Sequence, residues 1–80
     1  MLPPHVSSHQ RRLAHAFGHA ELTVHELWLR YLALGGDAGP TEVEAYLNDL
    51  MPLSSGEHNI LAQAVNERLD ELPSRRAPYY

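Results

Sequence analysis

Histidines are the most conspicuous candidates for chemistry, because four of the six lie within residues 9–26 and a fifth is His5. Imidazole binds transition metals, transfers protons and changes its charge near neutral pH. On a helix, His15 and His19 share a face and can chelate zinc, nickel or copper. Two ligands make a weak site, since structural zinc takes four protein ligands and catalytic zinc three. We therefore expect the polar side of a helix, with no resident metal or cofactor, and keep this pair as an alternative metal site.

The sequence contains no recognisable catalytic motif. His25-Glu26 begins like the zinc-protease motif, yet Leu29 stands where the second histidine belongs. No serine has the G-x-S-x-G context of a nucleophile, and there is no phosphate-binding loop or dinucleotide fingerprint. We predict that the protein is not an enzyme and has no catalytic residues.

Composition narrows the classes of partner. The chain has 80 residues, ten acids, six arginines and no lysine, which gives a net charge of −4 and favours one domain. The acids are concentrated in residues 41–80, whereas a nucleic-acid binder needs a basic face, so a nucleic-acid partner is disfavoured. No apolar run approaches the roughly 20 residues that span a bilayer, and residues 1–12 lack the apolar core of a signal peptide. We expect a cytoplasmic protein with no membrane contact.

A helix over 24–34 is the element that the sequence defines best. Thr23 and Glu26 have the spacing of a capping box, which satisfies the first N–H groups of a helix. Apolar residues then repeat at the spacing of a buried helical face: Val24, Leu27, Trp28, Tyr31 and Leu32. Gly35 and Gly36 follow, and a glycine commonly ends a helix in the left-handed conformation.

Two further helices are predicted over 41–51 and 55–72. Pro40 suits the first position of one, and Pro52 stops it. The other opens with the sequence SSGE, a second capping box. No segment alternates with period two, so strands are not expected.

A weaker N-terminal helix is expected over about 9–20, where Gly18 lowers the helix propensity. The prolines of residues 1–7 indicate a flexible arm, and 73–80 a flexible tail. The sequence thus predicts an all-α, compact bundle that forms one domain over 8–72. Its short loops favour packing between helices that are neighbours in sequence.

The apolar faces exceed what so small a bundle can easily bury. Trp28, Leu29, Tyr31 and Tyr46 are the candidates for surplus apolar surface, which a protein partner or a second copy would cover. Arg68 falls inside the apolar arc of the last helix. It is either a rim arginine, paired with Glu71 at i+3 or with Glu57 or Glu44 across the bundle, or an anchor for a partner. We predict a small protein-interaction or regulatory module, with self-association as its simplest form.

A DNA-binding regulator is the alternative from another class. The helices over 41–51 and 55–72 have the order of a helix-turn-helix, and polar side chains follow one face of the second: Asn59, Gln63, Asn66 and Asp70. Such amides can contact base edges. Phosphate contacts would have few donors, however: Arg68, Arg75 and Arg76. His58 is expected to be a surface residue.

Three stretches, LWLRYLALGG, EAYLNDLMPL and LAQAVNERLDEL, together resemble short, mostly uncharacterised helical proteins of high-GC bacteria. The resemblance covers roughly residues 26–72. It implies a cytosolic, non-enzymatic regulator. No binding or catalytic motif defines that group, so the resemblance assigns no functional residue.

Overall fold

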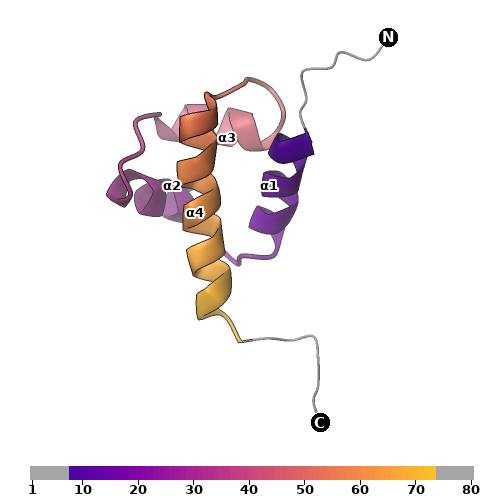
Figure 1. The fold of residues 1–80 in the computed structure, drawn as a ribbon, viewed down its shortest axis with the longest axis vertical. Coiled ribbons are helices and arrows are strands. Elements are labelled where there is room, and N and C mark those ends of the chain that lie inside the picture. The colour runs from indigo at the N-terminus through magenta and orange to yellow at the C-terminus, as the bar shows by residue number, and fades with distance from the viewer. Residues whose placement is uncertain (1–7, 74–80) are drawn as a thin grey trace.

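The computed structural model of the protein describes residues 8–73, which form four helices and no strand (Figure 1). They are α1 (Ser8–Gly18), α2 (Val24–Ala33), α3 (Pro40–Leu47) and α4 (Ser55–Glu71). The prediction of an all-α bundle, with a weaker N-terminal helix, is confirmed. The predicted arm over 1–7 and the predicted tail over 73–80, except Pro73, lie outside the described residues. Within this range, no helix combines the length and apolar character that crossing a bilayer requires.

Both ends of α2 are built as the sequence predicts. The Glu26 N–H donates to Thr23 Oγ1 at 3.1 Å, and the Thr23 N–H donates to Glu26 Oε1 at 2.8 Å, which completes the capping box. At the other end, Gly35 has φ +101°, and the Gly36 N–H donates to the Tyr31 carbonyl at 2.9 Å. A Cβ at Gly36 would collide with the Tyr31 ring. Both glycines are therefore required, one for its positive φ and one for a close approach.

Helix α3 is shorter than the predicted 41–51, because it ends at Leu47 rather than near Pro52. Asp49 has φ +63°, and the Leu50 N–H donates to the Ala45 carbonyl at 2.8 Å, which closes the helix end. Asparagine and aspartate enter the left-handed region more readily than other residues with a Cβ. The Asn-Asp pair at 48–49, and not the proline, ends the helix.

Helices that follow each other in sequence mostly do not pack together. α1 packs on α3 and α4, α2 packs on the same two helices, and α1 and α2 do not approach each other. The expectation that short loops pair sequence neighbours is therefore wrong for α1–α2 and for α3–α4. α1 and α4 instead lie side by side, and both begin at the same end of the molecule (Figure 1).

One core is shared by all four helices. Its buried apolar residues are Leu13, Ala20, Leu27, Tyr31, Val43, Tyr46, Leu47, Leu61, Ala64 and Val65. The prediction that Tyr31 and Tyr46 are surplus surface is wrong, since their exposed fractions are 0% and 4%. A tyrosine can be buried when its hydroxyl finds a partner. Tyr31 Oη hydrogen-bonds Glu57, and Tyr46 Oη lies 2.7 Å from His58 Nδ1.

Candidate functional site

A surface groove beside α2 brings together two of the five predicted partner-binding residues. Leu29 is 49% exposed and lines this groove with Arg68. Trp28 is half-buried outside the groove, and its Nε1–H donates to the Ala38 carbonyl at 3.0 Å. Tyr31 and Tyr46, as described above, belong to the core. Of the five residues, Leu29 is therefore exposed, Trp28 and Arg68 are half-buried, and the two tyrosines are buried.

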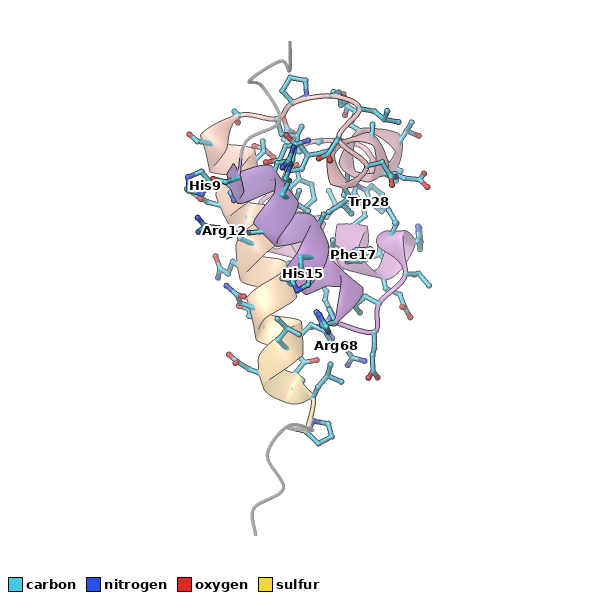
Figure 2. The ribbon with its side chains drawn as sticks, turned by 90° about the vertical axis from the view of Figure 1, so that its right-hand side faces the viewer. His9, Arg12, His15, Phe17, Trp28 and Arg68 are labelled. Atoms are coloured by element: carbon cyan, nitrogen blue, oxygen red, sulfur yellow. The ribbon has the colours of Figure 1, made fainter. Side chains whose placement is uncertain are left out.

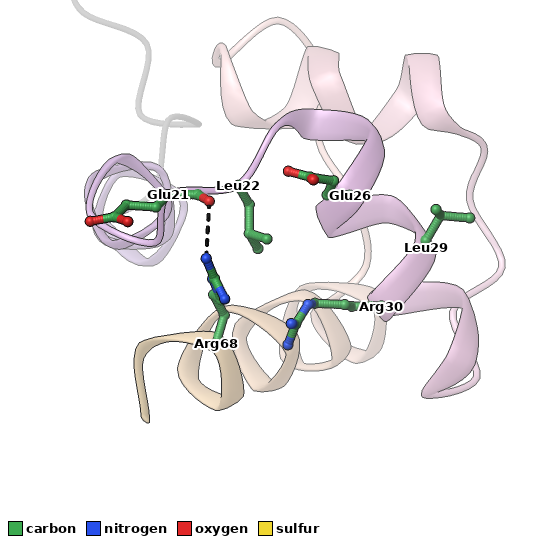
Figure 3. A pocket seen from close by; sticks show the side chains of 6 residues that line it. All are labelled: Glu21, Leu22, Glu26, Leu29, Arg30 and Arg68. Carbon is green, nitrogen blue, oxygen red and sulfur yellow. Dashed lines mark hydrogen bonds between the residues drawn. The ribbon is translucent and has the colours of Figure 1, made fainter. Parts of the chain in front are cut away.

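The groove, called the α2 groove below, has a volume of about 300 Å³ (Figure 3). Its lining residues are Glu21, Leu22, Glu26, Leu29, Arg30 and Arg68. They come from the turn between α1 and α2, from α2 and from the C-terminal half of α4. Leu32, one turn after Leu29 on the same helix, is 38% exposed and extends the apolar surface beyond the groove.

Arg68 is tied to the chain itself. Its Nε–H donates to the Ala20 carbonyl at 2.9 Å. Its Nη2 donates to the Glu21 carbonyl at 3.4 Å, the bond drawn in Figure 3. Glu21 has φ +56°, so Arg68 holds a turn that a residue with a Cβ rarely adopts. The predicted partner Glu71 is present, with 3.4 Å between Nη1 and Oε1. The carbonyl of Ala20 could not be foreseen, because it lies 48 residues away in sequence.

Glu71 also binds the other arginine of the groove. The guanidinium of Arg30 donates to both carboxylate oxygens, at 2.9 Å and 2.8 Å, in the bidentate geometry that gives strong charged hydrogen bonds. This contact lowers the pKa of Glu71 and raises the pKa of Arg30. Both arginines of the α2 groove are therefore already engaged within the chain, while the side chain of Leu29 is left half exposed.

His15, on α1, and His19, in the turn directly after Gly18, are both exposed, and α1 ends two residues before the predicted boundary near Ala20. Their ring centroids are 4.8 Å apart in an edge-on arrangement. Within residues 8–73, no three histidine, aspartate or glutamate side chains are grouped so that they could hold a metal ion. His25 packs against the Trp28 ring at 5.6 Å.

His58 is half-buried and does not match the expectation of a surface residue. Besides its hydrogen bond to Tyr46, its ring lies 6.0 Å from that of His9. Burial, and secondarily the nearby His9, lowers the pKa of His58. No local sequence pattern indicates the contact between His9 and His58, because it depends on α1 and α4 lying side by side.

The arrangement of α3 and α4 gives no support to the alternative prediction of a DNA-binding helix-turn-helix. The backbones of α3 and α4 do not come close, and the two helices meet through the side chains of Tyr46 and His58, whereas the helices of a helix-turn-helix pack directly. Asn59, Gln63 and Asn66 are exposed on α4, as expected. Arg68, a predicted phosphate donor, is occupied by Ala20 and Glu71.

Comparison with known proteins supplies no relative. No protein-family model matches the chain, and no curated protein or solved structure is significantly similar to it. The resemblance to short helical proteins of high-GC bacteria therefore stays a prediction.

Proposed function

We propose that the protein is a non-enzymatic interaction module that binds a second copy of itself through the α2 groove and the adjoining Leu32. The observation that carries the proposal is the exposure of Leu29 and Leu32, at 49% and 38%, on consecutive turns of one helix. Apolar side chains next to each other on a surface are typical of protein contacts. A regulatory role in the cytosol is the wider proposal, and it rests on the resemblance named above.

The pairing of charges in the groove favours an apolar partner surface. Arg30 and Arg68 are held by Glu71, and the Glu26 carboxylate accepts the Thr23 N–H. A partner can therefore cover Leu29 without burying an unpaired charge, which would cost several kcal/mol per ion. An apolar centre with a polar rim is also the usual composition of a protein interface.

A second copy is the simplest partner that offers such a surface. In a two-fold dimer the same patch occurs on both sides, so Leu29 and Leu32 of one copy would cover those of the other. Two copies of α2 that pack antiparallel also place the positive N-terminal end of each helix beside the negative C-terminal end of its partner. The same apolar stripe then provides both halves of the interface.

Sedimentation velocity over a concentration series tests the proposal, with two variants matched in chemistry. Leu29→Gln removes an exposed leucine from the α2 groove, and Leu50→Gln removes a leucine that is 77% exposed in the α3–α4 loop. We expect the mass of wild type and of Leu50→Gln to rise toward twice that of one chain. Leu29→Gln should stay monomeric over the same range.

A wild-type protein that stays monomeric at millimolar concentration would contradict the dimer. An equal loss of self-association in both leucine variants would also contradict it, because general surface hydrophobicity would then explain the association. Circular dichroism of each variant separates either result from unfolding.

A further inference from the structure

A second groove lies between α1 and α4, on residues that the proposed interaction does not use. It has a volume of about 260 Å³. Its lining residues are His9, Arg12, Leu13, Ala16, His58, Ala62, Val65 and Asn66. Figure 2 shows His9 and Arg12 on the part of α1 that lies along α4. This groove is called the α1–α4 groove below.

The α1–α4 groove has no acidic lining residue, although the chain has ten acids and six arginines. Arg12 is exposed, and the ion pairs between described residues involve Arg30 and Arg68 but not Arg12. Within the described part of the chain, no carboxylate therefore engages the donors of Arg12. Arginine is well suited to carboxylate and phosphate groups, because its planar donors match their oxygens.

The two histidines of the groove are set by the fold. Tyr46, from α3, hydrogen-bonds Nδ1 of His58 at 2.7 Å, which fixes the ring. Among residues 8–73, no hydrogen bond engages Nε2. His9 lies opposite, with 6.0 Å between ring centroids. Burial, and secondarily the proximity of His9, lowers the pKa of His58, and an anion bound beside its ring would favour the charged form of His58.

The helix ends add to this positive character. α1 begins at Ser8 and α4 at Ser55, and both first turns lie at the same end of the molecule (Figure 1). His9 and His58 belong to these first turns. The N-terminal end of a helix carries a partial positive charge and favours anions. The N-terminal ends of α1 and α4 therefore favour a bound anion, as the charge of Arg12 does.

We propose that the α1–α4 groove binds a small organic oxyanion, a carboxylate or phosphate carried on an apolar body. Arg12, His9 and His58 contact the anionic group, and the amide of Asn66 donates a further hydrogen bond. The apolar body lies on the floor of the groove, which consists of Leu13, Ala16, Ala62 and Val65. At about 260 Å³ the groove falls below the roughly 300–1,000 Å³ of pockets for drug-sized ligands, so the body is about the size of one ring.

The test is an amide NMR titration of the full chain with phenyl phosphate, which combines an oxyanion with one apolar ring. We expect saturable shifts of the His9, Arg12, His58 and Asn66 resonances. Inorganic phosphate, which lacks the apolar body, should bind at least about threefold more weakly. Absence of saturable shifts with phenyl phosphate at millimolar concentration would overturn the proposal.

Two arginine variants provide the matched control. Arg12→Gln removes the charge that lines the groove, and Arg11→Gln removes the neighbouring exposed charge, which does not line it. We expect the Kd for phenyl phosphate to rise about tenfold in Arg12→Gln, as for the loss of one charged hydrogen bond, and less than about twofold in Arg11→Gln. Equal weakening in both variants would mean attraction to diffuse positive charge and would overturn the site.

Ala62→Leu tests the apolar floor without changing any charge. The larger side chain fills the groove from α4, so phenyl phosphate binding should be lost while the amide spectrum remains dispersed. Unchanged binding in this variant would overturn the assignment of the floor. Leucine favours helix as strongly as the surrounding residues do, so the variant keeps α4 intact.

The pH arm uses benzoate, because its charge does not change between pH 6 and pH 8. The titratable groups at the groove are His9, His58 and Tyr46, with Asp49 acting on Tyr46 and Arg12 charged throughout. Burial, and secondarily His9, lowers the pKa of His58, and a carboxylate bound beside the ring raises it again, so benzoate should bind at least about threefold more tightly at pH 6 than at pH 8. Equal affinity at the two pH values would overturn the role of the histidines.

Discussion

The two grooves of this small bundle both contain arginine and leucine, but they differ in whether the arginine has a partner and in whether the leucine is exposed. In the α2 groove Arg30 and Arg68 are held by Glu71, and Arg68 also by a backbone carbonyl, whereas Arg12 of the α1–α4 groove has no such partner among residues 8–73. The leucines differ in the reverse sense, because Leu13 is 5% exposed and Leu29 is 49% exposed. An arginine already satisfied by the chain contributes to stability, and one that is not satisfied is available to a ligand. An exposed leucine is correspondingly available to a protein partner.

The largest expected difference is between the effects of Leu13→Ala and Leu29→Ala on the free energy of unfolding. Leu13→Ala should lower the free energy of unfolding by about 2–5 kcal/mol, because it leaves a cavity in the core. Leu29→Ala should change it by less than about 0.5 kcal/mol for the monomer, since the side chain is half exposed. Urea unfolding at low protein concentration measures the free energy of unfolding of both variants. Similar losses would show that the exposure of Leu29 does not describe the molecule in solution.

Substitutions of Arg68 and Arg12 should also differ in their effect on the free energy of unfolding, by a smaller amount. Arg68→Gln should cost about 1–3 kcal/mol, because the Ala20 carbonyl and the turn at Glu21 lose their donor. Arg12→Gln should stay within about 0.5 kcal/mol of wild type. If Arg12→Gln were the more destabilising change, Arg12 would have a structural partner and the distinction between the grooves would fail.

The free energy of unfolding should depend on pH through His58 of the α1–α4 groove and through Glu71, which holds the arginines of the α2 groove. The two groups should act in different pH ranges. The pKa of His58 is lowered from 6.5 by burial and by His9. Below about pH 6.5 the unfolded chain therefore binds more protons than the folded protein, and the free energy of unfolding should fall as the pH drops. Glu71, whose pKa is lowered from 4.5 by Arg30, should lose its contribution only as the pH falls below that value.

Two variants make this comparison measurable between pH 7.5 and pH 5.5. His58→Gln can still hydrogen-bond Tyr46 and should flatten the pH dependence in this window, whereas Glu71→Gln should not change the slope. A wild-type stability that does not vary between these pH values would refute the assignment of a lowered pKa to His58.

The smallest expected effect is the influence of one groove on the other. Arg12→Gln should leave the self-association constant unchanged within about twofold, and Leu29→Gln should leave the affinity for phenyl phosphate equally unchanged. Sites that share no residue and no partner usually behave additively. Sedimentation velocity and NMR titration of the two variants check this, and a change above about fivefold in either would mean that the grooves are coupled.

The features that the sequence predicted correctly are local ones. The capping box of Thr23 and Glu26, the glycine stop at Gly35 and the outward histidines of α1 depend on residues within one or two turns of each other. Helical spacing alone placed Arg68 inside the apolar arc of the last helix, and the structure shows it half-buried. Such features are set by backbone hydrogen bonding and periodicity, which short segments determine by themselves.

The features that sequence reasoning missed depend on which helices meet. The burial of Tyr31 and Tyr46 depends on hydroxyl partners in α4, 26 and 12 residues away. The contact of His9 with His58 requires α1 and α4 to lie side by side, although two helices separate them in sequence. The end of α3 was predicted wrongly for a different reason. Proline is the stronger helix-stop signal in the sequence, so the prediction placed the end near Pro52, whereas the helix ends earlier, where Asp49 adopts a positive φ.

The most direct test of the two-groove account compares two perturbations in one set of amide NMR spectra. One series raises the concentration of the wild-type protein alone, and the other adds phenyl phosphate to dilute protein. The account predicts that concentration shifts the resonances of Leu22, Leu29 and Leu32, whereas phenyl phosphate shifts those of His9, Arg12 and His58. A single set of residues that responds to both perturbations, or no response to either, would contradict it.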